Sequence, residues 1–269
     1  MKRFALVAVM ALVAVGLIPA TAGAGTDPGT GMVTIVHDAT YSANEPFPVT
    51  LCVNGDPFAG GVGQDPFVWG DVLGPVDLPA GTYTVAIYTG AIEVCEGEPA
   101  IGPQDLDVAA GDDITAAAIW TSAGPGLTVW PNDSSCVAPG EGRVTVRHGA
   151  DTDGPVDVVG TVGGTETVLV PNLAEGGQAG LDVPAPLAVT DVKVTPAGDS
   201  GTTLIAVGDV TFEPGVNTVV YAGGGNDGPA GVFVDVIQLT TCETPVEPTT
   251  TTTTTAAAQP ATATPAFTG

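Results

Sequence analysis

The chain has 269 residues, of which 30 are Asp or Glu and only 5 are Lys or Arg, so its formal charge is -25 at pH 7. Such a charge repels the phosphates of nucleic acids and the headgroups of anionic membranes, and no basic stripe offsets it. At 44% hydrophobic residues the sequence is too apolar for a disordered acidic chain, and its length allows one large or two ordinary domains. We therefore expect a folded protein whose partner is neither nucleic acid nor an anionic membrane surface.

The first 24 residues have the pattern of a signal peptide. Lys2 and Arg3 precede an uninterrupted apolar run over residues 4–18, and the small residues that follow fit an A-x-A cleavage site. As a helix this run spans roughly 22 Å, which is short of the ~30 Å hydrocarbon core of a membrane. We expect residues 1–24 to be cleaved, leaving no stable transmembrane segment in the mature chain.

The part of the chain that follows the signal peptide repeats itself. Val33-Thr34-Ile35-Val36-His37 returns as Val144-Thr145-Val146-Arg147-His148, and later segments recur at similar offsets. Each copy contains about seven short runs of alternating apolar and polar residues, one of them at residues 67–73, separated by turns rich in Gly, Pro and Asn. This pattern predicts an all-β protein of two tandem immunoglobulin-like antiparallel β-sandwich domains, although a jelly roll or a barrel has a similar pattern.

The domain boundaries follow from where the repeats begin and end. We expect domain 1 at residues 32–131, a linker at 132–142 and domain 2 at 143–242. Residues 243–269 include seven consecutive threonines, Thr249 to Thr255, and have almost nothing to bury, which predicts a disordered Thr/Pro-rich stalk.

The four cysteines most economically form two disulfides in an exported protein. Three pairings are possible, and we favour Cys52 with Cys95 in the first copy and Cys136 with Cys242 across the ends of the second. Cys52 alternates with the apolar residues of its strand and therefore faces away from them, toward a loop that carries Cys95. A metal site is the alternative, but the sequence has neither a C-x-x-C motif nor clustered histidines.

Three motifs of the first copy are typical of one family. Val33 to His37 fits a V-x-V-x-H strand with Ile35 in place of the second valine, and Val49 to Gly55 fits V-x-V-x-V-N-G with Leu51 in that place. Leu78 to Val85 reads L-P-A-G-T-Y-x-V. The second copy contributes Val144 to His148, Pro155 to Val158 and Val207 to Val210. Over roughly residues 32 to 240, the chain resembles a tandem pair of the secreted bacterial "domain of unknown function 4397", a family frequent in actinobacterial surface proteins. The resemblance implies a β-sandwich and an extracellular role, with no established activity.

Histidines and acidic residues are the candidates for a metal site. His37 and His148 end the first strand of each copy, and because each copy has one histidine we expect it to hydrogen-bond a backbone carbonyl and fix the next loop. Oxygen ligands of the kind that Ca²⁺ prefers are offered by Asp105 and Asp107, Asp112 and Asp113, Asp151 and Asp153, and Asp133. None of these fits the loop motif D-x-[DN]-x-[DN]-G, so we expect no metal ion and no cofactor.

Catalytic motifs are lacking in the sequence. It has no G-x-S-x-G and no recognisable triad, and we expect its cysteines to be oxidised. So acidic a chain offers many carboxylate pairs for glycan hydrolysis, but the aromatic residues that usually line sugar clefts make up only 5% of it. An intramolecular Lys–Asn cross-link would have to use Lys193. We expect Trp69, Trp120 and Trp130 to pack in a core or at its rim rather than to form a ligand platform.

Together these features predict a non-catalytic, secreted or cell-surface module with a structural or recognition role and no catalytic residues. Its partner would be a cell-envelope component or another surface protein, and it would be extracellular or associated with the cell wall. Two alternatives stay open at this point, a calcium-dependent adhesion module and a secreted glycan hydrolase.

Overall fold

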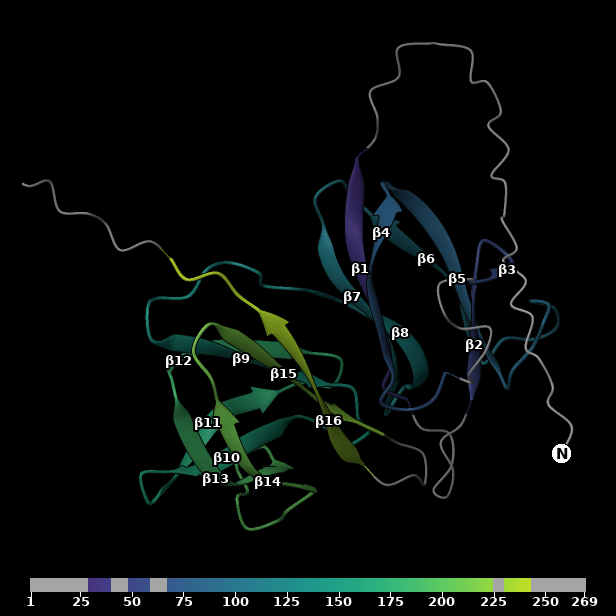
Figure 1. The fold of residues 1–269 in the computed structure, drawn as a ribbon. Coiled ribbons are helices and arrows are strands. Elements are labelled where there is room, and N and C mark those ends of the chain that lie inside the picture. Colours follow the sequence, from purple (N-terminus) through teal and green to yellow (C-terminus); the bar gives the residue numbers. More distant parts are fainter. Residues whose placement is uncertain (1–28, 40–47, 59–66, 225–229, 243–269) are drawn as a thin grey trace, which may run out of the picture.

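The computed structural model describes residues 29–39, 48–58, 67–224 and 230–242, which form strands and the turns between them (Figure 1). Within these ranges there is no helix, and so none long and apolar enough to cross a membrane. The expected signal peptide at 1–24 and the expected stalk at 243–269 lie outside the described residues.

The first eight strands form two four-stranded sheets, which we call unit 1. They are β1 (Thr30–His37), β2 (Val49–Val53), β3 (Asp56–Pro57), β4 (Val72–Pro79), β5 (Gly81–Thr89), β6 (Ile101–Val108), β7 (Asp113–Thr121) and β8 (Gly124–Pro131). One sheet has the order β4-β1-β7-β8 and the other β3-β2-β5-β6. Strands β1 and β7 pair in parallel, and all other neighbours in unit 1 are antiparallel.

The next eight strands form a second pair of sheets, which we call unit 2. They are β9 (Glu141–His148), β10 (Val156–Val162), β11 (Thr165–Leu173), β12 (Gln178–Pro184), β13 (Leu187–Pro196), β14 (Ile205–Phe212), β15 (Val216–Gly223) and β16 (Gly231–Gln238). Their sheets have the orders β12-β9-β15-β16 and β11-β10-β13-β14. Unit 2 therefore repeats the strand order of unit 1, and its parallel pair, β9 with β15, corresponds to β1 with β7.

Each unit encloses its own hydrophobic core between its two sheets. In unit 1, alternate residues of β7, which are Ile114, Ala116 and Ala118, face this core. In unit 2, Val144 and Val146 of β9, the strand equivalent to β1, face the other core. Period-two alternation thus buries one face of each sheet, and the arrangement is consistent with a β-sandwich.

One predicted strand lies elsewhere in the structure. The strand expected at residues 67–73 begins only at Val72 and continues to Pro79. A turn comes first, because the Asp71 carboxylate accepts a hydrogen bond of 2.7 Å from the Val68 amide, while the Asp71 amide donates to the Val68 carbonyl at 3.0 Å. Gly70 lies inside this turn with a φ of 88°, a backbone conformation that favours glycine.

The two units pack against each other through one sheet each, and they lie side by side in Figure 1. Their contact forms a third hydrophobic cluster, in which Ala117 and Trp130 of unit 1 meet Val219 and Tyr221 of unit 2. Sheet β4-β1-β7-β8 and sheet β12-β9-β15-β16 are therefore covered on both faces. Residues 132–140, which we call the connecting segment, run between β8 and β9 along the edge of this contact.

Candidate functional site

A buried arginine lies at the centre of the contact between the units. Because Val144 and Val146 face the core of unit 2, the alternation of β9 directs Arg147 to the opposite face, where it is 1% exposed. Its guanidinium donates hydrogen bonds to the hydroxyls of Thr115, at 2.9 Å, and Tyr221, at 2.6 Å. It also donates to the side-chain carbonyls of Asn132 and Gln178. The Arg147 side chain thus links strand β7 and the connecting segment to unit 2 through its hydrogen bonds.

Aromatic rings complete the surroundings of Arg147. The guanidinium carbon lies 5.2 Å from the ring centres of both Trp130 and Tyr221, within the range of a cation–π interaction. Burial lowers the pKa of Arg147, and burial likewise raises the pKa of Tyr221. Neutral hydrogen-bond acceptors and ring faces, rather than a direct ion pair, therefore compensate this cation for the water that it has lost.

A fully buried acid, Asp38, lies in the same contact directly after β1. Its amide donates to the Ala118 carbonyl at 2.8 Å and its carbonyl accepts from the Gly224 amide at 3.1 Å, but neither carboxylate oxygen has a hydrogen-bond partner among the described residues. The carboxylate lies against Gly149 and Gly223, where a Cβ on either glycine would collide with it. Burial raises the pKa of Asp38 well above its ordinary value, and the charge of Arg147 only partly opposes this.

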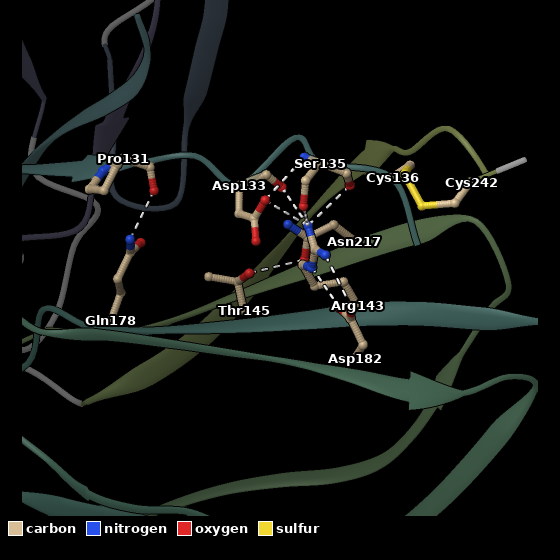
Figure 2. A network of polar contacts seen from close by, with 10 residues as sticks. All are labelled: Pro131, Asp133, Ser135, Cys136, Arg143, Thr145, Gln178, Asp182, Asn217 and Cys242. Carbon is tan, nitrogen blue, oxygen red and sulfur yellow. Dashed lines mark hydrogen bonds and ion pairs between the residues drawn. A yellow bond between two sulfur atoms is a disulfide. The ribbon is translucent and has the colours of Figure 1, made fainter. Parts of the chain in front are cut away.

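A second arginine fastens the connecting segment to unit 2 (Figure 2). The Arg143 guanidinium forms a two-pronged ion pair with Asp182 on β12, with distances of 2.7 and 3.2 Å. Its Nη1 lies 2.9 Å from the Asp133 carboxylate and donates to the Ser135 hydroxyl and carbonyl. Hydrogen bonds from Ser135, followed by the charge of Arg143, lower the pKa of Asp133, and the bond with Asp182 raises the pKa of Arg143.

Two polar hollows lie on either side of this connecting segment. One, of about 370 Å³, is lined by residues that include Asp133, Arg143, Gln178 and Asp182, and Figure 2 shows these side chains around it. The other has a volume of about 500 Å³ and a lining shared by both units. Its polar residues include Thr34, Asp113, Asn132 and Asp235. Each hollow thus presents hydrogen-bonding groups and two carboxylates.

The structure contains two disulfides, Cys52–Cys95 and Cys136–Cys242, so all four cysteines are paired. These are the two pairs that the sequence favoured. The second one joins the connecting segment to the residues after β16, and the Cys242 amide donates to the Val137 carbonyl at 2.8 Å beside it. Disulfides of this kind are typical of proteins that fold in an oxidising compartment outside the cytoplasm.

The histidines are buried at the ends of their strands. Nδ1 of His148 lies 3.2 Å from the Leu173 carbonyl and Nε2 lies 3.0 Å from the Thr152 hydroxyl, so this ring holds the loop after β9 as expected. Burial lowers the pKa of His148, which favours the neutral ring. His37 in unit 1 packs on Phe67, with 5.9 Å between the ring centres.

The acid pairs that were considered as calcium ligands form hydrogen bonds with nearby groups of the chain. Asp105 and Asp107 accept hydrogen bonds from Thr84 and Thr82 across the β5–β6 pair, at 3.2 and 2.6 Å. Asp112 accepts from the Ala109 amide and Asp113 from the Asn132 side chain, both at 2.7 Å. The Asp153 amide donates to Asp151 at 3.4 Å. In the parts of the chain that the structure describes, no three His, Cys, Asp or Glu side chains are placed to hold a metal ion.

Two of the three tryptophans belong to the contact between the units. Trp130 is 3% exposed and its Nε1 donates to the Gly176 carbonyl of unit 2 at 2.7 Å. Trp69 packs edge-on against Phe233 of unit 2, with 5.6 Å between ring centres, whereas Trp120 packs against the core of unit 1. The tryptophans thus pack against other apolar side chains as expected, but Trp130 and Trp69 do so between the two units rather than inside unit 1.

Sequence reasoning missed this contact altogether. A signal for it was present in β7, where the run Ala116 to Ile119 is apolar without interruption. Such a run is typical of a strand covered on both faces, whereas a strand with one face in water alternates.

All three basic residues beyond Arg3 have partners. Arg143 is ion-paired, Arg147 is buried, and the Lys193 ammonium lies 3.0 Å from the Glu166 carboxylate. The described surface therefore offers a partner many carboxylates and no uncommitted lysine or arginine.

Residues 31–159 match the family model described as "Domain of unknown function (DUF4397)". This match spans unit 1, the connecting segment and the beginning of unit 2, and it supports the resemblance found in the sequence motifs. No curated protein sequence matches the chain.

Several solved structures resemble the chain only weakly. A leucine-rich repeat protein from Bacteroides thetaiotaomicron VPI-5482 is 16% identical with a TM-score of 0.19, over 80% of this chain and 27% of its own. The Bacillus anthracis TIE protein is 14% identical with a TM-score of 0.21, over 77% of this chain and 34% of its own. A "putative cell adhesion protein" from Bacteroides eggerthii DSM 20697 is 11% identical with a TM-score of 0.20, over 80% and 98%. The chain thus spans about a third or less of the first two proteins, and TM-scores this low carry no argument about function.

Proposed function

We propose that this chain, whose residues 31–159 match the domain of unknown function 4397 family, is a non-catalytic recognition module on the outside of the cell. It would consist of two tandem immunoglobulin-like sandwiches. Its signal peptide would direct its export, and its Thr/Pro-rich stalk would act as a spacer between the sandwiches and the cell surface. The two disulfides support a place outside the cytoplasm. The family match and the sequence motifs indicate no activity of their own.

The observation that carries this proposal is the fixed contact between the units. Arg147, Trp130 and Tyr221 hold the two facing sheets together, and Arg143 with Cys136–Cys242 holds the segment that connects the units. Polar hollows on either side of that segment therefore keep their shape before a partner arrives, and preorganisation lowers the cost of binding.

The chemistry of these hollows favours a partner rich in hydrogen-bond donors. Asp113 and Asp235 line one hollow and Asp133 and Asp182 line the other, while the acidic surface repels anions. A neutral, polyhydroxylated component of the cell envelope fits these groups. Another surface protein with a basic or hydroxyl-rich face is the alternative partner.

Capture of cell-envelope material on the purified chain tests this function. We expect wild type to retain neutral glycan, and Asp235→Asn to retain less because it removes a carboxylate from the larger hollow. Asp107→Asn is the matched control, since Asp107 carries the same charge on β6 and lies outside both linings. Equal retention by both variants, or no retention by wild type, would contradict a recognition role at this place.

The two alternatives are separated by the same preparation. Retention that disappears with EDTA and returns with Ca²⁺ would indicate the calcium-dependent adhesion module. New reducing ends in the incubated glycan would indicate a hydrolase and would contradict the non-catalytic assignment.

A further inference from the structure

The core of unit 2 contains a cavity that unit 1 lacks. It measures about 240 Å³ and lies between the two sheets of unit 2, whereas the corresponding space in unit 1 is about 30 Å³. Native cores are close-packed, and voids larger than a water molecule are few. A space of this size in one of two units with the same strand order therefore calls for a reason.

The difference comes from the side chains that line the two spaces. Unit 1 directs three aromatic rings inward, Phe58, Phe67 and Tyr83, whereas the lining in unit 2 has only Phe212. Strand register locates one exchange: Tyr83 pairs with Leu106 on β6, and in the same place of unit 2 Val189 pairs with Val210. Twelve of the eighteen lining residues in unit 2 are valine, and because valine is stiff at χ1 these side chains do not swing inward to close the space.

The lining is suited to an apolar molecule and not to water. Thr167 is its only polar side chain, and the Thr167 hydroxyl donates to the Thr165 carbonyl at 3.3 Å. An ordered water needs two to four polar partners, whereas an apolar cavity stays dry and takes up apolar molecules. An engineered cavity of 150 Å³ binds benzene, so 240 Å³ accommodates roughly ten carbon atoms by proportion.

The lining reaches the surface between two edge strands. Val168 on β11 and Leu181 on β12 belong to the lining, yet they are 46% and 38% exposed. Strands β11 and β12 end their respective sheets, so no further described strand pairs with their outer edges. Apolar side chains on both sides of this opening provide a route from solvent into the cavity.

We propose that unit 2 binds a small neutral apolar molecule of roughly ten carbon atoms in its core, through the opening between β11 and β12. Neutrality follows from the formal charge of -25 and from a lining that has no cation to pair with a carboxylate. This site is separate from the polar hollows between the units, and either site can exist without the other.

Titration of the purified chain with naphthalene, followed by the fluorescence of the ligand, tests the proposal. We expect saturable binding at one site, and weaker binding of decanoate because its carboxylate lacks a partner. Val189→Phe adds a ring to the lining of the cavity and is expected to weaken naphthalene binding at least tenfold while raising the melting temperature. Val236→Phe is the matched control, since Val236 is exposed on β16 and lies outside the lining.

A second variant keeps the test decisive if Val189→Phe does not fold. Val168→Glu puts a charge at the opening, where the side chain can extend into water, and is expected to weaken binding with little change in melting temperature. Naphthalene binding that is absent in wild type, or unchanged in a folded Val189→Phe variant, would overturn the proposal. Tighter binding of decanoate than of naphthalene would overturn the neutral class of ligand.

Discussion

The two units share one strand order and differ in what fills them. Unit 1 brings Phe58, Phe67 and Tyr83 into its core, while unit 2 relies on valines and keeps a cavity of about 240 Å³. Strand order thus depends on where apolar residues alternate, which both copies preserve, and packing density depends on the volumes of those residues, which they do not. A fold can therefore be kept while its interior becomes available for another use.

The edge strands differ in the same way. Strand β3 has two residues, whereas β11, in the same place of unit 2, has nine. The longer β11 carries Val168 to the surface beside the cavity. Opening and cavity thus occur in the same unit.

The largest expected effect comes from the disulfides, which close loops of different length in the two units. Replacing Cys136 and Cys242 by Ala opens a disulfide-closed loop whose ends are 106 residues apart. Because the unfolded chain then gains conformational entropy, we expect the free energy of unfolding to fall by about 4.7 kcal/mol. The same change at Cys52 and Cys95 frees 43 residues and should cost about 4 kcal/mol. Urea denaturation of the two double variants measures both values, and a larger loss at the shorter separation would contradict the chain-entropy explanation.

Removal of Arg147 should uncouple the units. Arg147→Met keeps the length of the side chain but leaves the Thr115 and Tyr221 hydroxyls without this donor, and we expect a loss of about 3 kcal/mol in the free energy of unfolding. Calorimetry should then resolve two transitions where wild type shows one. Lys193→Met removes a cation that lies outside the contact as a control, and a single unchanged transition in the Arg147 variant would show that the contact is not held in this way.

A smaller side chain at Phe67 should loosen the core of unit 1, so that its packing becomes more like that of unit 2. Phe67 pairs with Val49 as Leu173 pairs with Val156, so the two residues occupy equivalent positions. We expect Phe67→Val to cost about 2 to 3 kcal/mol and Leu173→Val about 1 kcal/mol, because the larger side chain leaves the larger void. Urea denaturation of the two variants measures both losses, and equal losses would contradict this explanation.

The last test concerns pH at the contact between the units. Because the folded protein binds the Asp38 proton more tightly than the unfolded chain, whose pKa is near 3.8, the free energy of unfolding should fall as the pH rises above that value. One proton limits the slope to about 1.4 kcal/mol per pH unit. Asp38→Asn should flatten this part of the profile in urea denaturation from about pH 4 to about pH 8. A profile that matches wild type would show that Asp38 does not titrate there.

Much of the strand pattern could be predicted from the sequence. Most predicted runs overlap observed strands, since alternation and turn residues act locally. The run at 67–73 failed because Asp71 bonds back to the Val68 amide, a side-chain contact that alternation does not report. His148 was placed correctly because a histidine at a strand end lies beside a loop whose carbonyls need partners.

The candidate site was far harder to predict from the sequence. Asp133 was singled out for calcium, yet its partner is Arg143. Arg147 appeared only as one position of a repeated motif. Its guanidinium donates hydrogen bonds to Thr115, Asn132 and Tyr221, which are separated from it by 15 to 74 residues in the chain. A residue's burial between two units depends on surfaces that no single segment encodes.

The sequence by itself determined that this protein is built of strands, that its pattern recurs, and that its few cations are outnumbered by acids. Those properties are carried by neighbouring residues or by simple counts. Only the tertiary structure decided which faces of the sheets meet, why Asp38 is buried against two glycines, and which unit keeps a cavity in its core. These depend on the sum of side-chain volumes brought together from distant strands, and the volume of a core is a property of the assembled fold.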